Sequence, residues 1–284
     1  MTATVPSRLH PRLQRVVGSA LGELNRIGSQ AQFYAKTVKS IPDAIVNYRT
    51  EVWRLIAQMG LGAGALAVIG GTVAIVGFLT ITTGAIIAVQ GYAQLSSVGI
   101  EAFTGFGSAF FNVRLVVPGT TAVALSATIG AGATAQIGAM RINEEIDALE
   151  VIGIRSITYL AASRVIAGVT VVIPLFCVAV MMAFLSARTG TTAIYGQASG
   201  VYDHYFNTFL NPMDLIWSFF QVVWLTVVIM LVHTYYGYTA SGGPAGVGEA
   251  VGRAVRTSMV VAAVVIVFIS LAVYGQSGNL NLAG

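Results

Sequence analysis

Charged residues are scarce in this chain of 284 residues. Lysine, arginine, aspartate and glutamate together make up 9% of it, against about 25% in an ordinary soluble domain. So few charges cannot cover the surface of a soluble enzyme. A chain that is 56% hydrophobic is also too apolar to remain disordered. Both classes are therefore excluded.

Patterns that would carry chemistry are missing as well. The single cysteine, Cys177, excludes an internal disulfide, and its place in an apolar run predicts a packed small side chain. Lys36 and Lys39 are the only lysines, and neither follows glycine as a phosphate-binding loop requires. We therefore expect no catalytic residues, no metal site and no cofactor bound by this chain. The basic residues lie at predicted helix ends, so the net charge of +4 does not indicate nucleic-acid binding.

The charges that are present are bunched, and they leave long apolar stretches between them. A helix needs about 20 apolar residues to cross a bilayer, and continuous apolar runs exclude a β-barrel. The sequence thus predicts an all-α polytopic membrane protein with five transmembrane helices, near residues 60–91, 115–139, 157–186, 213–236 and 257–274. The first run is long enough for a tilted helix or for a break between Thr80 and Gly84. Pro174 makes a kink plausible in the third.

The first 56 residues form a basic cytoplasmic or interfacial region, and residues 57–284 form the five-span domain. Apolar residues recur in this region at loosely helical spacing, at Val17, Leu21, Leu24, Ile27, Ile41, Ile45, Trp53 and Ile56. With eight basic residues beside them, this favours an interfacial amphipathic helix over a disordered tail. No cleavable signal peptide is visible.

Basic residues also predict the orientation. If the N-terminus is cytoplasmic, every lysine and arginine other than Arg114 and Arg188 lies on the inner side, as the positive-inside rule requires. With five spans, the C-terminus then lies outside the cytoplasm. The membrane that we expect to hold the protein is the inner (plasma) membrane.

The densest acidic cluster falls between the second and third predicted spans, within residues 142–154. It reads as a short helix with Asn143 as the N-cap, Glu144 and Glu145 in the first turn, and Gly153 as the stop. Ile142, Ile146, Leu149 and Ile152 share one face of it, and Glu144, Asp147 and Glu150 lie largely elsewhere. An anionic membrane surface repels such a helix, so the pattern favours a basic protein partner.

Small residues recur every four positions in the second predicted span. One row holds Ser126, Gly130, Thr134 and Gly138, and the next holds Ala127, Ala131, Ala135 and Ala139. Such rows let another helix approach closely, either for internal packing or around a lipid path. His233, deep in the fourth span, has no acidic partner in any span, which favours packing or hydrogen bonding over proton transfer.

The predicted outer loop, about residues 189–211, is rich in aromatic residues. These are either an aromatic belt at the membrane interface or a contact surface for an outer partner. The set comprises Tyr195, Tyr202, Tyr205, Phe206 and Phe209.

Two motifs resemble a known family. Residues Ala139–Arg141 followed by Glu144–Gly153, and Gly243–Gly248 followed by Ala250, Ala254 and Val255, resemble the signatures of the MlaE/YrbE permeases. The basic N-terminal extension and the tyrosine-rich loop look closest to actinobacterial, including mycobacterial, YrbE subunits, with the B type favoured. The resemblance covers about residues 50–280.

The resemblance implies a permease subunit of an ABC lipid transporter that works with MCE-domain proteins. The acidic helix would be its coupling helix, with Glu144, Glu145, Asp147, Leu149, Glu150 and Gly153 contacting the ATPase. ATP and Mg would bind a separate cytoplasmic ABC ATPase dimer (MceG-like). A second YrbE-type permease would complete a heterodimer, and MCE proteins would contact the outer side. The implied substrate is a lipid, with a fatty acid or mycolic-type lipid and import favoured.

One departure concerns the possible lipid path, which comprises Ser126, Thr128, Gly130, Thr134, Gln136 and Gly138. Relatives such as MlaE often carry Arg and Glu where this chain has Thr128 and Gln136, which argues against a charged headgroup contact there. The alternatives are an envelope scaffold that anchors MCE proteins, or a permease for a sterol or phospholipid. An independent channel or secondary transporter would show repeats or paired charges, and neither is visible.

Overall fold

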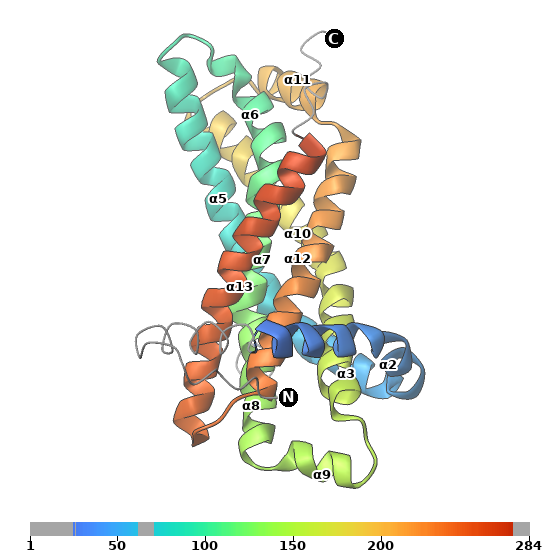
Figure 1. The fold of residues 1–284 in the computed structure, drawn as a ribbon. Coiled ribbons are helices and arrows are strands. Elements are labelled where there is room, and N and C mark those ends of the chain that lie inside the picture. Colours follow the sequence, from blue (N-terminus) through green and yellow to red (C-terminus); the bar gives the residue numbers. More distant parts are fainter. Residues whose placement is uncertain (1–24, 26, 62–70, 275–284) are drawn as a thin grey trace, which may run out of the picture.

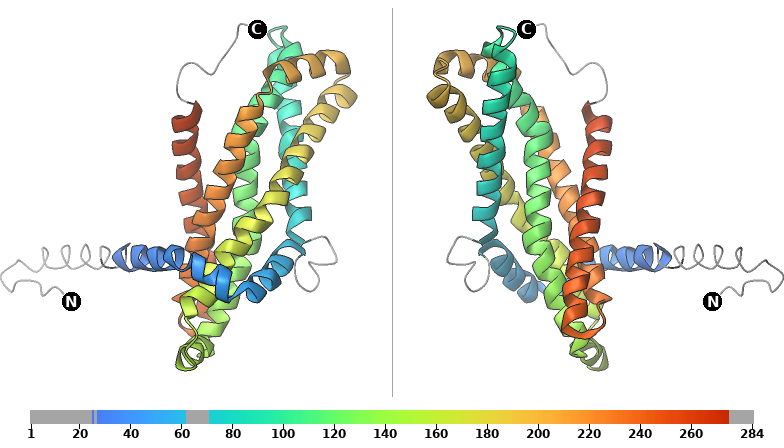
Figure 2. Two further views of the ribbon diagram at one scale, coloured as in Figure 1. Left: turned by 90° about the vertical axis from the view of Figure 1, so that its right-hand side faces the viewer. Right: turned by 90° about the vertical axis from the view of Figure 1, so that its left-hand side faces the viewer.

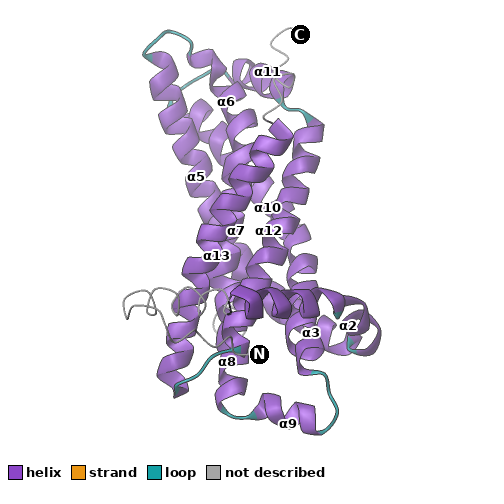
Figure 3. Ribbon diagram, viewed as in Figure 1, coloured by secondary structure: helices purple, strands orange, loops and turns teal. Residues whose placement is uncertain are grey.

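The structure is a computed structural model that describes residues 25, 27–61 and 71–274. Within these residues every regular element is a helix (Figure 3), which confirms the all-α prediction. The predicted positions Val17, Leu21 and Leu24 lie outside the described residues, as does the first part of the first predicted span.

Five helical segments are long and apolar enough to cross a membrane, which confirms the predicted number. They run side by side along the molecule (Figure 1) and pack into one bundle whose core includes Leu125, Val172 and Leu225. Their bounds are Gly71–Ser96, Glu101–Ile142, Ile157–Ile194, Pro212–Tyr238 and Gly243–Val273. The chain is therefore a multi-pass membrane protein.

The first span is the continuous helix α5 (Gly71–Ser96), with no break between Thr80 and Gly84. The Thr80 hydroxyl donates to the Val76 carbonyl at 2.9 Å, so its polar group is satisfied inside the helix. Gly84 serves a close helix contact instead. A Cβ there would lie 2.6 Å from the Ala183 carbonyl oxygen of α10 (Ser163–Thr189).

The second span begins well before the predicted Leu115. It is assembled end to end from η1 (Glu101–Phe103), α6 (Thr104–Phe111), η2 (Asn112–Val116), α7 (Val117–Leu125), η3 (Ser126–Gly130) and α8 (Ala131–Ile142), of which η2 and η3 are π-helical. Arg114 lies inside this segment and not at its end. Its guanidinium donates to the Asp214 carboxylate at 2.7 Å, and both side chains are largely buried. The ion pair lets a charged residue sit within the bundle.

The remaining spans are 38, 27 and 31 residues long. The third consists of η4 (Ile157–Ala162), α10 and η5 (Gly190–Ile194), with η4 and η5 π-helical, and Pro174 lies inside α10. The fourth is α12 (Pro212–Tyr238), and α11 (Ser199–Phe209) precedes it. The fifth, α13 (Gly243–Tyr274), starts before the predicted residue 257, because its first turns carry Glu249 and Arg253 as an ion pair.

Cys177 is exposed on α10, so its predicted burial is wrong. In an apolar span an exposed side chain faces the surrounding apolar phase, which a small thiol tolerates as well as a packed position.

The described part of the N-terminal region is helical. A helix over residues 27–39 is followed by α2 (Ile41–Asn47) and α3 (Arg49–Leu61), and residues 27–39 extend sideways from the bundle (Figure 2). Phe33 is buried between Tyr235 and Tyr238, which anchors this helix to α12. Val46 and Trp53 stay exposed, as expected of helices that lie at a membrane interface.

Candidate functional site

The short helix α9 (Glu145–Val151) connects the second and third spans at one end of the molecule (Figure 1). Asn143 is not its N-cap, contrary to the prediction. Asn143 closes α8, and Glu144 precedes α9 in the left-handed region with φ 60°. A non-glycine residue there costs about 1–3 kcal/mol, so the surrounding turn holds Glu144 in place.

The end of α9 agrees with the predicted stop at Gly153. Gly153 has φ 83°, its amide donates to the Glu150 carbonyl at 3.0 Å, and the Ile154 amide donates to the Leu149 carbonyl at 2.9 Å. This pair of bonds is a Schellman motif, which ends a helix sharply. It turns the chain back towards the third span.

The acidic side chains of this segment fall into two groups. Asp147 pairs with Arg141 at 2.7 Å, and Glu150 accepts a hydrogen bond from the Ser156 hydroxyl at 2.5 Å. Glu144 and Glu145 are exposed. The exposed face of the turn before α9 is therefore anionic, and Glu150 ties the end of α9 to the bundle.

The apolar side chains of α9 are divided differently from the prediction. Ile146 is fully buried against Ile137 and Leu160. Ile152 was expected on the same apolar face, and it is 70% exposed, while Val151 is 86% exposed. Ile152 is the C-cap residue that follows α9, and at six residues from Ile146 it lies about 120° around the helix axis, away from the side that Ile146 buries. The tip of α9 thus presents two uncovered apolar side chains beside the exposed acids.

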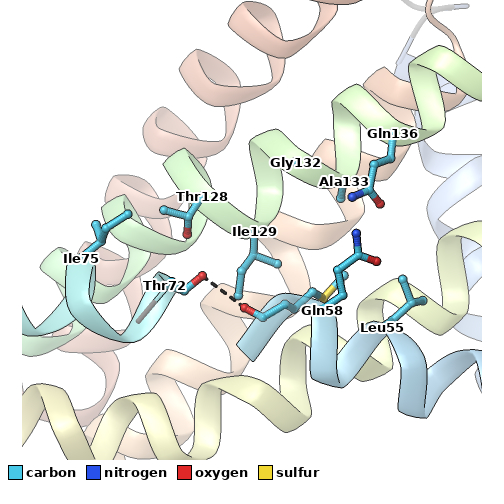
Figure 4. Close-up of a pocket in the computed structure, with 11 residues that line it drawn as sticks. Leu55, Gln58, Thr72, Ile75, Thr128, Ile129, Gly132, Ala133 and Gln136 are labelled. Atoms are coloured by element: carbon cyan, nitrogen blue, oxygen red, sulfur yellow. Dashed lines mark hydrogen bonds between the residues drawn. The ribbon is translucent and has the colours of Figure 1, made fainter. Parts of the chain in front are cut away.

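A cavity of about 150 Å³ lies between α3, α5, η3 and α8 (Figure 4). Thr128 and Gln136 line it, and the amides of Gln58 and Gln136 point toward one another. Its lining combines apolar side chains with uncharged polar ones: Leu55, Gln58, Met59, Gly71, Thr72, Ile75, Thr128, Ile129, Gly132, Ala133 and Gln136. Nη2 of Arg164, on α10, donates to the Gln136 amide oxygen at 3.3 Å.

The other predicted path residues lie on a different side of the second span and pack against α12 and α13. Thr134 Oγ1 lies 2.8 Å from His233 Nδ1, and Ser126 Oγ lies 3.2 Å from His233 Nε2. Ser258 of α13 completes this set at 3.1 Å from Nε2. We call His233, Ser126, Thr134 and Ser258 the His233 cluster. It joins three spans through both ring nitrogens, which agrees with the predicted hydrogen-bonding role of His233.

Glycines make this contact possible. A Cβ on Gly130 would meet the His233 ring at 2.6 Å, and one on Gly138 would meet Val247 at 2.9 Å. The structure therefore divides the predicted set: Thr128 and Gln136 reach the cavity, while Ser126, Gly130, Thr134 and Gly138 hold helices together. The signal that could have separated them is their position on the helix, since Thr128 and Gln136 lie outside the four-residue row.

The outer aromatic residues pack against one another and against neighbouring helices. Tyr195 stacks on Tyr92 of α5, and Tyr202 is 1% exposed. The other three contact rings of η1, α6 and α10, in the pairs Tyr205 with Phe103, Phe209 with Phe106, and Phe206 with Phe184. Most of this aromatic surface is thus used within the chain.

An ion pair fastens α11 to the end of α10. Both nitrogens Nε and Nη2 of Arg188 donate to the Asp203 carboxylate at 2.8 Å. This bidentate bond lowers the pKa of the Asp203 carboxyl group below its ordinary value. Within the described residues, no group of three or more His, Cys, Asp or Glu side chains could hold a metal ion.

Comparison with known proteins places residues 61–272 within the model of a single family, Permease MlaE. Similar curated proteins include TRIGALACTOSYLDIACYLGLYCEROL 1 of Arabidopsis thaliana, a chloroplast protein, with 28% identity over 61% of this chain. A probable ABC transporter permease of Synechocystis is 27% identical over 60% of the chain, and one of Rickettsia bellii is 27% identical over 66%.

The matched region covers these relatives unequally. It spans 49% of the Arabidopsis protein, 64% of the Synechocystis protein and 72% of the Rickettsia protein.

Proposed function

The chain belongs to the MlaE permease family, and on that premise we propose that it is the membrane permease subunit of an ATP-driven transporter that moves lipid. The observation that carries this proposal is the exposed tip of α9. It combines the exposed carboxylates of Glu144 and Glu145 with the uncovered apolar side chains Val151 and Ile152. An apolar centre with a charged rim is the usual composition of a protein docking site.

The partner at this tip is a separate cytoplasmic ABC ATPase dimer, which supplies ATP and Mg. This chain is then a permease and not itself an enzyme. Glu150 connects α9 to the bundle, since the Tyr238 hydroxyl of α12 also donates to its carboxylate at 3.3 Å. Movement of α9 by the ATPase would thereby reach the fourth span directly.

The cavity lined by Thr128 and Gln136 belongs to the lipid path. Its apolar residues suit acyl chains, and its amides and hydroxyls suit an uncharged polar group. A fatty acid or mycolic-type lipid, moved inward, is the proposed cargo. The galactolipid in the name of the Arabidopsis relative supports a lipid substrate.

The remaining partners are a second permease subunit of the YrbE type and MCE-domain proteins on the outer side, with this chain as the B-type member. Exposed alanines support the first of these, because Ala127, Ala135 and Ala139 leave an uncovered seam on the second span. The proposed setting is the inner membrane with α9 and the N-terminus in the cytoplasm, and the C-terminus outside.

Charge reversal at the tip of α9 tests this function. The paired substitutions Glu144→Lys and Glu145→Lys should reduce both ATPase co-purification and ATP-dependent lipid transfer in proteoliposomes by tenfold or more, since a loss of about 1.4 kcal/mol in docking already gives tenfold. Membrane insertion should be unchanged. Glu249→Lys is the control, because Glu249 is an exposed acid that lies on α13 and not on α9. Full transfer activity in the paired variant would overturn the proposal.

A further inference from the structure

A second hollow lies on the α9 side of the bundle and is separate from the cavity in Figure 4. It is a groove of about 550 Å³ between two walls. One wall is the end of the helix over residues 27–39 with the start of α2, and the other is the link 153–158 between α9 and the third span. None of its charged residues belongs to the exposed tip of α9.

Three cations line this groove. Lys36 and Lys39 lie three residues apart on one helix and therefore on the same side of it. Both are exposed, and neither takes part in an ion pair between described residues. Arg155 faces them from the other wall. The only two lysines of the chain are thus gathered at one site.

The two acids of the groove are held by other groups. The Asp43 carboxylate accepts from Asn47 Nδ2 at 2.6 Å and from Arg155 Nη1 at 3.3 Å. Glu150 is bonded to Ser156 and Tyr238. Because neither acid bonds to a lysine, the two ammonium groups are the part of the lining that remains open to an anion.

The neighbouring helices indicate how deep the groove lies in the membrane. The helices α2 and α3 that adjoin it expose Ile45, Val46 and Trp53, at 53%, 72% and 68%. Such side chains place an interfacial helix at the boundary between acyl chains and headgroups. Lysines on the adjoining turn are then level with the phosphates of the leaflet.

We propose that this groove binds the phosphate of an anionic phospholipid from the leaflet on the α9 side, with Lys36 and Lys39 as its contacts and Arg155, which is paired with Asp43, facing them. The proposal rests on the proposed membrane setting, but it requires neither ATP nor transport. A lipid bound there touches both the interfacial helices and the link that follows α9. It would therefore fix the position of α9 relative to the membrane surface.

The test uses the full chain in phosphatidylcholine vesicles that contain a photoactivatable phosphatidylglycerol. Mass spectrometry should find the label on peptides that contain residues 36–39 or 153–158. Unlabelled phosphatidylglycerol should compete and phosphatidylcholine should not. Label elsewhere only, or equal competition by both lipids, would overturn the proposal.

Variants decide whether the lysines carry the binding. Lys36→Gln with Lys39→Gln should weaken competition by phosphatidylglycerol about thirtyfold, from the usual contribution of each lysine near an anionic surface. Lys36→Arg with Lys39→Arg should retain it. The matched control, Arg253→Gln with Arg256→Gln, removes the same charge at the base of α13 and should change it by less than about twofold. Equal losses in the glutamine variant and the control would show a general surface potential and refute the site.

Two further measurements distinguish the phospholipid from other possible occupants of the groove. Competition by inorganic phosphate as strong as that by phosphatidylglycerol would assign the groove to free phosphate. Loss of labelling whenever a co-purifying ATPase is present would assign it to a protein partner. Either result overturns the lipid proposal. A chain that is labelled in the groove but inactive in lipid transfer would leave this proposal standing and contradict the proposed function.

Discussion

Replacing Gly130 with alanine should destabilise the bundle, although alanine is the better helix former. A Cβ at this position would lie 2.6 Å from Cδ2, 2.7 Å from Nε2 and 2.9 Å from Cγ of His233. Ordinary contact distances require the ring and the helix to separate by about 1 Å. The ring cannot move freely, because three hydroxyls from the second and fifth spans hold it.

The expected change in the free energy of unfolding combines two costs and one gain. Overpacking a tight contact costs about 1–3 kcal/mol. Displacing the ring also weakens its hydrogen bonds to Thr134, Ser126 and Ser258, each worth about 0.6 kcal/mol inside a membrane protein. Against this, glycine to alanine in a helix is favourable by about 1 kcal/mol. The net expectation is a loss of about 2–3 kcal/mol in the free energy of unfolding.

A double-mutant cycle in mixed micelles with a denaturing detergent measures this coupling. In a His233→Ala background the clash is gone, so Gly130→Ala should become neutral or stabilising. The control Gly132→Ala, two residues further along the same span and with no atom within 4 Å of its Cβ, should change stability by less than about 0.5 kcal/mol. The reasoning is refuted if Gly130→Ala stabilises the unaltered chain, or if His233→Ala fails to remove its cost.

Three further predictions concern single contacts. Arg114→Ala should lower the free energy of unfolding by about 3 kcal/mol, because it leaves the Asp214 carboxylate buried without its guanidinium partner. Unfolding in a denaturing detergent should show a smaller loss when Asp214→Ala is added. Because Arg188 lowers the pKa of Asp203, their pair should stabilise α11 fully above about pH 4 and lose that effect as the pH falls through the folded-state pKa. The distance between spin labels on α11 and α10 should report this loss, and Asp203→Asn should abolish the pH dependence. Gly153→Ala should cost about 1 kcal/mol and reduce ATPase co-purification, since φ 83° strains any other residue, and an unchanged yield would contradict this.

The number of spans could be predicted from the sequence because charge and hydropathy report the membrane directly. Their ends could not. Arg114 looks like the edge of a span until Asp214, 100 residues away, is seen to neutralise it. Similarly, Glu249 and Arg253 suggest a late start for the last span, but they lie within α13, which extends beyond the apolar region.

The acidic helix was located correctly, but its exposed surface was not. The spacing of Ile146 and Ile152 predicts one apolar face, and only the packing of the folded chain shows that Ile146 is covered and Ile152 is not. Likewise Tyr202 belongs to an aromatic-rich loop in the sequence and is buried in the fold. Both outcomes depend on where a helix ends or docks, which local spacing does not contain.

Photo-cross-linking from the tip of α9 tests the central claim most directly. A photoreactive amino acid at Val151, which is 86% exposed, should capture an ABC ATPase subunit in native membranes. The same group at Val98, which is exposed in the turn after α5 at the opposite end of the bundle, should not. Capture of the ATPase from Val151 alone is the predicted result. Capture of no ATP-binding protein from Val151, while the transporter is active, would contradict the account.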